Sequence, residues 1–233
     1  MGIFDMFKKK DNDETSLVQK VNLAKEEVHK VCLDKKPLID LKAKVALVLD
    51  YSGSMDWLYS NGTVQRVVEK MLPLAMNFDD DGSMETWLFS DSCRRLKDAN
   101  LNNLDGYIKR ETKGKSMGGT NYSPVMGDII KFYKNEKLPV YVIFITDGDN
   151  FDNDKTDTTA TIIEAAKKPI FWQFVGLGDS KFSYLESLDN LEGRYVDNAD
   201  FFAVSKAENI TYQDLLKEFP TWLSDQKVKD MLV

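Results

Sequence analysis

The feature that most constrains the fold is a series of short apolar runs along the middle of the chain, at residues 45–50, 84–89, 140–145 and 170–175. Segments with helical periodicity separate them, around residues 64–76, 124–133 and 158–168. Apolar runs of strand length that alternate with helices are typical of a parallel sheet covered on both faces. The sequence therefore predicts an α/β fold with a mostly parallel central sheet and helices on both of its faces.

Shorter segments complete the expected sheet and its surroundings. Residues 93–96 follow the second run so closely that they suit a short antiparallel edge strand, and we expect a last strand at residues 194–196. Helical patterns at residues 212–219 and 222–232 are expected to cover one end of the sheet. Before the first run, apolar residues recur at helical spacing, which predicts an amphipathic helix: they are Leu17, Val21, Ala24, Val28 and Val31.

Charge and composition exclude several classes of function. The formal net charge of −7 repels phosphate backbones, so we expect no nucleic-acid partner. His29 is the only histidine, which argues against a histidine base and against histidine-bound zinc or iron. Cys32 and Cys93 are expected to be reduced thiols, although one disulfide stays formally open. No apolar run is long enough to span a membrane and no signal peptide is evident, so we expect a cytoplasmic protein.

Oxygen-bearing side chains gather where the expected strands end. Ligands of open parallel sheets bind at the carboxyl ends of the strands, so the residues that follow the first and third runs should share one edge. A loop with two adjacent glycines, Gly118 and Gly119, lies between them in sequence and can bring its next residue close. We also expect the turn after the first run to require Gly53. The candidate metal-binding residues are Asp50, Ser52, Ser54, Thr120 and Asp147.

The chemistry of this set favours a hard divalent cation. Two carboxylates and three hydroxyls, with no imidazole or thiolate, are oxygen ligands that suit Mg²⁺, with Mn²⁺ or Ca²⁺ as alternatives. Two aspartates held together would also repel each other without a cation between them. The sequence therefore predicts a Mg²⁺ site at the carboxyl edge of the sheet.

The order of these residues resembles the metal-ion-dependent adhesion site (MIDAS) of von Willebrand factor A (vWA) domains. That site has an Asp-x-Ser-x-Ser segment, here Asp50 to Ser54, followed by a threonine and an aspartate. The resemblance implies a Rossmann-like three-layer sandwich. It also implies that both serines and Thr120 bind the metal directly, that the two aspartates act mostly through water, and that a protein partner completes the coordination with an Asp or Glu carboxylate.

A closer resemblance is to the bacterial TerF-like vWA group of tellurium-resistance proteins. It rests on the segment Leu-Val-Leu-Asp-Tyr-Ser-Gly-Ser-Met around Asp50, on Thr-Asp-Gly-Asp-Asn at 146–150, and on Leu-Leu-Lys-Glu-Phe-Pro-Thr-Trp-Leu at 215–223. The resemblance implies a bacterial protein-interaction module in a stress-response or tellurium-resistance system, rather than an enzyme. The alternative is a metal-dependent hydrolase or phosphatase that uses the same aspartates.

These patterns divide the chain into four parts. Residues 1–15 are expected to be a flexible N-terminal tail, and residues 16–41 an N-terminal amphipathic helix with a linker. Residues 42–206 form the expected vWA domain, and residues 207–233 a C-terminal helical extension packed on it.

Three features near the site leave alternatives open. Tyr51 and Trp57 flank the metal loop, where they either contact a partner or pack in the core. The segment from Gly114 to Ser116 resembles the end of a phosphate-binding loop, but Lys109 stands where that motif needs a glycine. Four aspartates either rim the metal site or form a solvated loop: Asp149, Asp152, Asp154 and Asp157.

Overall fold

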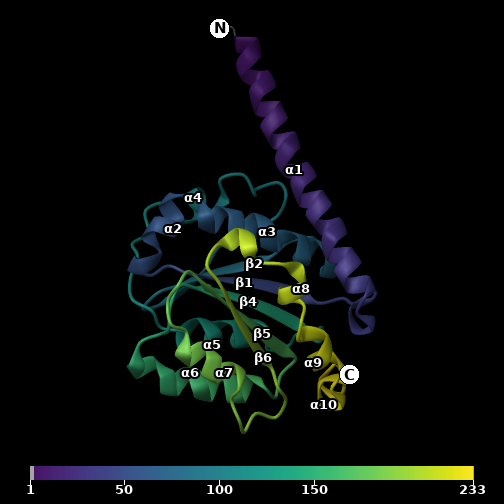
Figure 1. Cartoon of the computed structure of the whole chain (residues 1–233), viewed down its shortest axis with the longest axis vertical. Helices are drawn as coiled ribbons and strands as arrows, with labels where there is room; N and C mark the ends of the chain where they lie inside the picture. The colour runs from purple at the N-terminus through teal and green to yellow at the C-terminus, as the bar shows by residue number, and fades with distance from the viewer. Residues whose placement is uncertain (1–2, 233) are drawn as a thin grey trace.

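The structure is a computed structural model that describes the backbone of residues 3–232 and the side chains of residues 17–232. A six-stranded sheet lies at its centre (Figure 1). The strands are β1 (Lys44–Asp50), β2 (Glu85–Phe89), β3 (Cys93–Arg95), β4 (Val140–Thr146), β5 (Ile170–Leu177) and β6 (Ala199–Val204).

The strand order across the sheet is β3-β2-β1-β4-β5-β6. All neighbouring strands are parallel except β3, which runs antiparallel to β2 at one edge. The predicted parallel sheet with one antiparallel edge strand is therefore confirmed. Because the chain proceeds outwards from β1 in one direction and later from β4 in the other, the connection changes direction between these two neighbours, and ligands of open α/β sheets bind at the carboxyl ends of such strands.

The last strand lies later in the chain than expected. Residues 194–196 precede β6, and the guanidinium of Arg194 donates hydrogen bonds to the carbonyls of Leu191 and Asp189 in a turn. Strand β6 is only partly buried and contains Asp200, so it lacks the continuous apolar run that marks the central strands. The prediction of a strand at 194–196 is wrong for this reason.

Helices cover both faces of the sheet, as predicted. On one face lie α1 (Ile3–Leu33) and α3 (Thr63–Phe78), and on the other lie α5 (Ser123–Phe132), α6 (Asp152–Ala165) and α7 (Ser183–Asp189) (Figure 1). The side chains of β1 alternate between two hydrophobic clusters, with Leu47 and Leu49 on the α3 side and Ala46 and Val48 on the α5 side. The shorter helices are α2 (Asp56–Ser60), α4 (Tyr107–Glu111) and three 3₁₀ turns, Lys36–Leu38, Gly53–Met55 and Ala207–Asn209.

Helix α1 begins earlier than the sequence pattern indicated. The structure places residues 3–15 in this helix, where we expected a flexible tail. Neither proline nor glycine interrupts residues 3–36, so nothing in the sequence ends the helix before Pro37. Val21, Val28 and Val31 are buried against the domain, which confirms the expected apolar face. The helix extends from there beyond the body of the molecule (Figure 1).

The C-terminal helices pack on the same face as α1. They are α8 (Tyr212–Leu215), α9 (Phe219–Ser224) and α10 (Gln226–Met231). The ring of Phe219 lies 4.6 Å from that of Tyr141 on β4, and Trp222 lies 5.6 Å from Phe171 on β5, measured between centroids. These aromatic contacts cover the outer half of the sheet. Within the described part of the chain, no helix has both the length and the apolarity to cross a membrane.

Candidate metal centre

Asp50 lies fully buried at the carboxyl end of β1. Its Oδ1 accepts a hydrogen bond of 2.8 Å from the backbone N–H of Ser52, and its Oδ2 accepts one of 2.7 Å from the hydroxyl of Thr146. The hydroxyl of Tyr59 donates to the Asp50 carbonyl at 2.7 Å. The carboxylate is therefore fixed by its own loop on one side and by the end of the neighbouring strand β4 on the other.

A chain of hydrogen bonds leads from this buried position to the surface. The hydroxyl oxygens of Ser52 and Ser54 are 3.1 Å apart, and the Ser54 hydroxyl donates to Asp147 Oδ1 at 2.9 Å. Ser52 is buried, Asp147 is half-buried and Ser54 is exposed. The structure thus joins four of the predicted site residues, Asp50, Ser52, Ser54 and Asp147, through direct hydrogen bonds.

Thr120 lies on a loop that is attached to the serine loop through its backbone. Gly53 N–H donates to the Gly118 carbonyl at 3.1 Å, and Gly118 N–H donates to the Tyr51 carbonyl at 3.2 Å. The Thr120 carbonyl accepts the N–H of Phe151 at 3.0 Å. Within residues 17–232, the Thr120 hydroxyl makes no hydrogen bond, so it is available as a ligand.

The two glycines of this loop are required by space. A Cβ on Gly118 would lie 2.4 Å from Asp91 Oδ2, and one on Gly119 would lie 2.4 Å from both Asp91 Oδ1 and Phe151 Cε2. The N–H of Gly119 also donates to Asp91 Oδ2 at 2.8 Å. Gly53 is different, since no heavy atom lies within 4 Å of a Cβ built there and its φ is not positive. The expectation that the turn requires Gly53 is therefore wrong.

Both carboxylates of the site have raised pKa values. Burial raises the pKa of Asp50 to about 6, against hydrogen bonds from Thr146 and Ser52 that lower it, and nearby Asp147 adds to the increase. Burial also raises the pKa of Asp147, although the hydrogen bond from Ser54 partly offsets it. The folded protein thus holds two carboxylates where their charge is unfavourable, and a cation would relieve this cost.

The donor set fits a small hard cation. Two neighbouring ligands of an octahedral Mg²⁺ ion, each about 2.0–2.1 Å from the metal, lie about 2.8–3.0 Å apart. The hydroxyl oxygens of Ser52 and Ser54 are separated by 3.1 Å, which is close to that spacing. Asp147 Oδ1 accepts the Ser54 hydroxyl at 2.9 Å, which places a carboxylate beside the pair. In the described residues no three Asp, Glu, His or Cys side chains form a metal-binding group, so any cation here must depend on hydroxyl ligands. This is the donor set that the sequence predicted.

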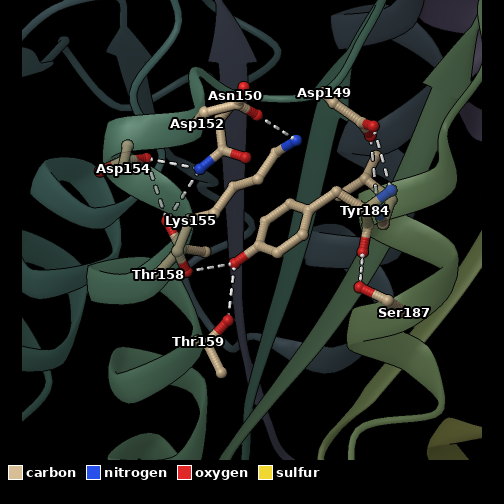
Figure 2. Close-up of polar contacts among 10 residues, drawn as sticks. Asp149, Asn150, Asp152, Asp154, Lys155, Thr158, Thr159, Tyr184 and Ser187 are labelled. Carbon is tan, nitrogen blue, oxygen red and sulfur yellow. Dashed lines mark hydrogen bonds and ion pairs between the residues drawn. The ribbon is translucent and has the colours of Figure 1, made fainter.

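The aspartates after β4 do not form a solvated loop. Helix α6 begins at Asp152, and Asp149 Oδ2 accepts the backbone N–H of Tyr184 at 3.0 Å (Figure 2). Asp152 is exposed and pairs with Lys155. Asp149 therefore anchors the start of α7, and the acidic residues at the start of α6 lie where the helix dipole favours them.

Asp154 is a buried anchor that the sequence pattern did not identify. Its Oδ2 accepts hydrogen bonds from the N–H of Tyr122 at 2.5 Å, from Asn150 Nδ2 at 2.7 Å and from the hydroxyl of Thr158 at 3.0 Å (Figure 2 shows the Asn150 contact). It also accepts from Ser123, at the start of α5. Burial would raise the pKa of Asp154, but these hydrogen bonds outweigh it and hold the pKa below its usual value. This carboxylate fixes the segment that follows Thr120.

The two aromatic residues of the metal loop have different environments. Tyr51 is nearly buried and packs edge-on against Tyr59, with ring centroids 4.9 Å apart. Trp57 on α2 is 71% exposed, and Phe151 beyond β4 is 50% exposed. Exposed aromatic side chains on both flanks of the site offer contact area to a partner.

Comparison with known proteins supports the interpretation of the fold. The chain is 40% identical over 224 residues to the uncharacterized protein YcbR of Bacillus subtilis (strain 168), covering 91% of this chain and 90% of YcbR. The two proteins are therefore similar over nearly their whole lengths.

Solved structures share the fold at low sequence identity. A von Willebrand factor type A protein from Catenulispora acidiphila matches with a TM-score of 0.51 at 14% identity, covering 82% of this chain and 43% of that one. Proximal thread matrix protein 1 from the mussel byssus, with a zinc-occupied MIDAS motif, matches with a TM-score of 0.54 at 16% identity. This match covers 77% of this chain and 46% of that one. Manganese-loaded TRAP protein of Plasmodium vivax matches with a TM-score of 0.52 at 16% identity, covering 70% of this chain and 69% of that one. The chain spans less than half the length of the first two.

A family model gives the most specific match. The model for vWA-TerF-like domains, described as the vWA found in the TerF C terminus, matches residues 42–232. That range contains all six strands and the C-terminal helices α8 to α10. The match agrees with the observed Rossmann-like sheet. The chain belongs to the vWA-TerF-like family.

Proposed function

We propose that this protein is a Mg²⁺-dependent protein-binding module, in which the bound cation accepts an Asp or Glu carboxylate from a partner. The observation that carries the proposal is the chain of hydrogen bonds that runs from buried Asp50 and Ser52 through the exposed Ser54 hydroxyl to half-buried Asp147. Such a set holds a cation firmly from inside and leaves its outer side open.

The residues of the site have separate tasks in this proposal. Ser52, Ser54 and Thr120 supply neutral oxygens to the metal, and the aspartates supply the negative charge that retains it. With few anionic ligands bound directly, the cation remains electrophilic towards a partner carboxylate. Mn²⁺ and Ca²⁺ are the alternative cations, and the zinc and manganese named for two vWA neighbours support a divalent ion.

The proposed role is binding without turnover. His29 lies on α1 beside Leu38 and Asn77, near the amino end of β1 and so at the opposite edge of the sheet from the site. None of the five candidate ligands is a histidine, lysine or cysteine, and the base within reach of the Ser54 hydroxyl is a carboxylate, which is a weak base for activating a serine. We further propose that the module acts in the cytoplasm, in a bacterial stress-response or tellurium-resistance assembly, as its TerF-like family suggests.

The test uses Mn²⁺ as a paramagnetic substitute for Mg²⁺. Protein loaded with Mn²⁺ enhances the relaxation of bulk water protons through the water molecules on the metal. Acetate, a minimal mimic of a partner side chain, should lower this enhancement in a saturable manner by displacing water. Acetamide, which has the same shape without the charge, should have no such effect.

Two variants complete this experiment. Ser54→Ala removes a ligand and should abolish Mn²⁺ binding, whereas Ser60→Ala removes an exposed hydroxyl on α2 that bonds only to the Trp57 carbonyl and should leave it intact. If Mn²⁺ binds the wild type but acetate and acetamide act alike, a bridge to a partner carboxylate is excluded. If both variants bind Mn²⁺ as the wild type does, the metal lies elsewhere.

A further inference from the structure

A polar cavity of about 180 Å³ lies beside the metal loop, between the β2–β3 hairpin and the loop that follows α4. Tyr51 connects the cavity with the metal loop, since it lines the cavity and stands between Asp50 and Ser52 in sequence. The polar side chains that line the cavity are those of Ser90, Ser92, Arg94, Lys115 and Ser116. A space of this volume exceeds by far what a single water needs.

The charge on these walls is positive in a chain whose net charge is −7. Arg66, Arg95 and Arg194 each pair with a carboxylate, but among residues 17–232 Arg94 pairs with none. The ammonium of Lys115 donates to the neutral carbonyl of Glu111, which leaves its charge uncompensated. The lining thus carries two cationic residues and no carboxylate.

Three serine hydroxyls of the lining are further potential donors. The hydroxyls of Ser90, Ser92 and Ser116 form no hydrogen bond within the described part of the chain. Burial and the nearby charge of Asp128 raise the pKa of Cys93, so its thiol adds no negative charge to the wall. Asp91 does not line the cavity, because its carboxylate turns to the N–H of Gly119 at 2.8 Å.

The loop that carries Lys115 is held in place. The hydroxyl of Tyr51 donates to the Lys115 carbonyl at 3.2 Å, and Gly114 has φ of +73°, a conformation that other residues rarely adopt. The Gly114-Lys115-Ser116 segment is no P-loop, since the next helix, α5, begins only at Ser123. It nevertheless places a lysine and a serine in the lining of the same cavity as Arg94.

We propose that this cavity is a binding site for a phosphate monoester. A tetrahedral oxyanion with three or four acceptor oxygens matches one guanidinium, one ammonium and three hydroxyl donors, which no single neutral ligand would satisfy. Carrying two negative charges near neutral pH, it also matches the two unbalanced cations. The site is distinct from the proposed cation and does not depend on it, since none of its donors is a candidate metal ligand.

The test is a titration of the ¹⁵N-labelled full chain, followed by NMR in the presence of EDTA. The probes are O-phosphoserine, inorganic phosphate and unmodified serine. We expect saturable shifts at the amides of Ser90, Ser92, Gly114 and Ser116 with phosphoserine, and none with serine. A response to phosphoserine that exceeds the response to inorganic phosphate indicates a phosphorylated side chain as the source, and equal responses indicate free phosphate. Either result supports the site.

Matched variants make the assignment specific. Arg94→Gln and Lys115→Gln should each weaken binding about tenfold, as expected for the loss of one charge-assisted contact. Lys113→Gln removes the same charge two residues away, from an exposed side chain outside the cavity, and should bind like the wild type. Thermal melts confirm that the variants fold. The proposal is overturned if neither phosphate compound gives saturable shifts at millimolar concentration, or if Arg94→Gln and Lys115→Gln bind as Lys113→Gln does.

Discussion

At the scale of single residues, the candidate metal centre depends as much on supporting side chains as on ligands. Thr146 donates to Asp50, Asp91 accepts the N–H of Gly119, and Asp154 accepts hydrogen bonds from the start of α5. The first contact holds Asp50 against the end of β4, and the other two hold the loop that carries Thr120. Supporting contacts of this kind orient metal ligands and influence affinity.

Thr146→Val should destabilise the protein by about 1–3 kcal/mol, because it leaves Oδ2 of the buried Asp50 without its donor. The loss should be larger at pH 8 than at pH 5, since only the charged carboxylate strongly requires the hydrogen bond and the pKa of Asp50 is about 6. Urea unfolding of metal-free protein at both pH values measures this. An equal free energy of unfolding for the variant and the wild type would contradict the role given to Thr146.

Asp154→Asn should lower the free energy of unfolding by about 2 kcal/mol at pH 7, because the carboxylate accepts several hydrogen bonds from buried groups. The pKa of Asp154 is below its usual value in the folded protein. Its contribution is therefore present at neutral pH and is lost as the pH falls through that lowered pKa. Unfolding curves should show that the difference in free energy of unfolding between variant and wild type is smaller below pH ~4 than at pH 7.

Asp157→Asn is the matched control, since Asp157 is exposed on the same helix. This variant should change stability by less than about 0.5 kcal/mol. Similar losses in both variants would mean that the charge of α6, rather than the hydrogen bonds of Asp154, supports the fold.

At the scale of elements, the central strands and long helices were predictable from sequence, but partly buried segments were not. Strands β1, β4 and β5 are buried along their whole lengths or nearly so, and their apolar runs reveal them. Strand β6 mixes buried and exposed positions, so its pattern is weak. The start of α6 is rich in aspartates and resembles a loop in sequence, although two of them make specific structural contacts.

The candidate ligands were predictable because each follows a recognisable strand or a double glycine, so their placement depends on topology alone. Asp154 could not be identified in the same way, because its importance depends on donors from Tyr122 and Ser123, which are distant in sequence. The sequence indicated this role only by placing Asp154 one helical turn before Thr158. Trp57 likewise could be assigned to the surface only from the structure.

The loop with Gly118 and Gly119 is expected to control cation affinity through the position of Thr120. Gly119→Ala places a methyl group against Asp91 and Phe151, so the loop must shift and move Thr120. We expect cation affinity to fall by at least about tenfold, as for loss of one ligand or its support. Titration of metal-stripped protein with Mg²⁺ by calorimetry measures it.

Gly127→Ala provides the comparison, because nothing lies within 4 Å of a Cβ at this exposed position in α5. It should leave cation affinity unchanged and stabilise the protein by about 0.5–1 kcal/mol, since glycine is a poor helix former. Unchanged Mg²⁺ affinity in Gly119→Ala would show that the position of Thr120 does not matter for the cation.

At the scale of the whole molecule, the strand order creates the site. The neighbours β1 and β4 are far apart in sequence, and the chain leaves them in opposite directions across the sheet. Their carboxyl ends therefore lie at the point of the sheet where open α/β folds bind ligands. The helix α1 and the C-terminal helices lie on one face and leave this edge free (Figure 1).

The most direct test of the account is a thermal melt of metal-stripped protein with increasing Mg²⁺, for the wild type and for Thr120→Ala and Ser60→Ala. A ligand that binds only the folded state must raise the melting temperature. At a hundredfold excess over the dissociation constant we expect an increase of about 5 °C or more in the wild type and in Ser60→Ala. Thr120→Ala should melt like the wild type without metal and show little increase with it. If millimolar Mg²⁺ leaves the wild-type melting temperature unchanged, the cation is not part of how this protein binds.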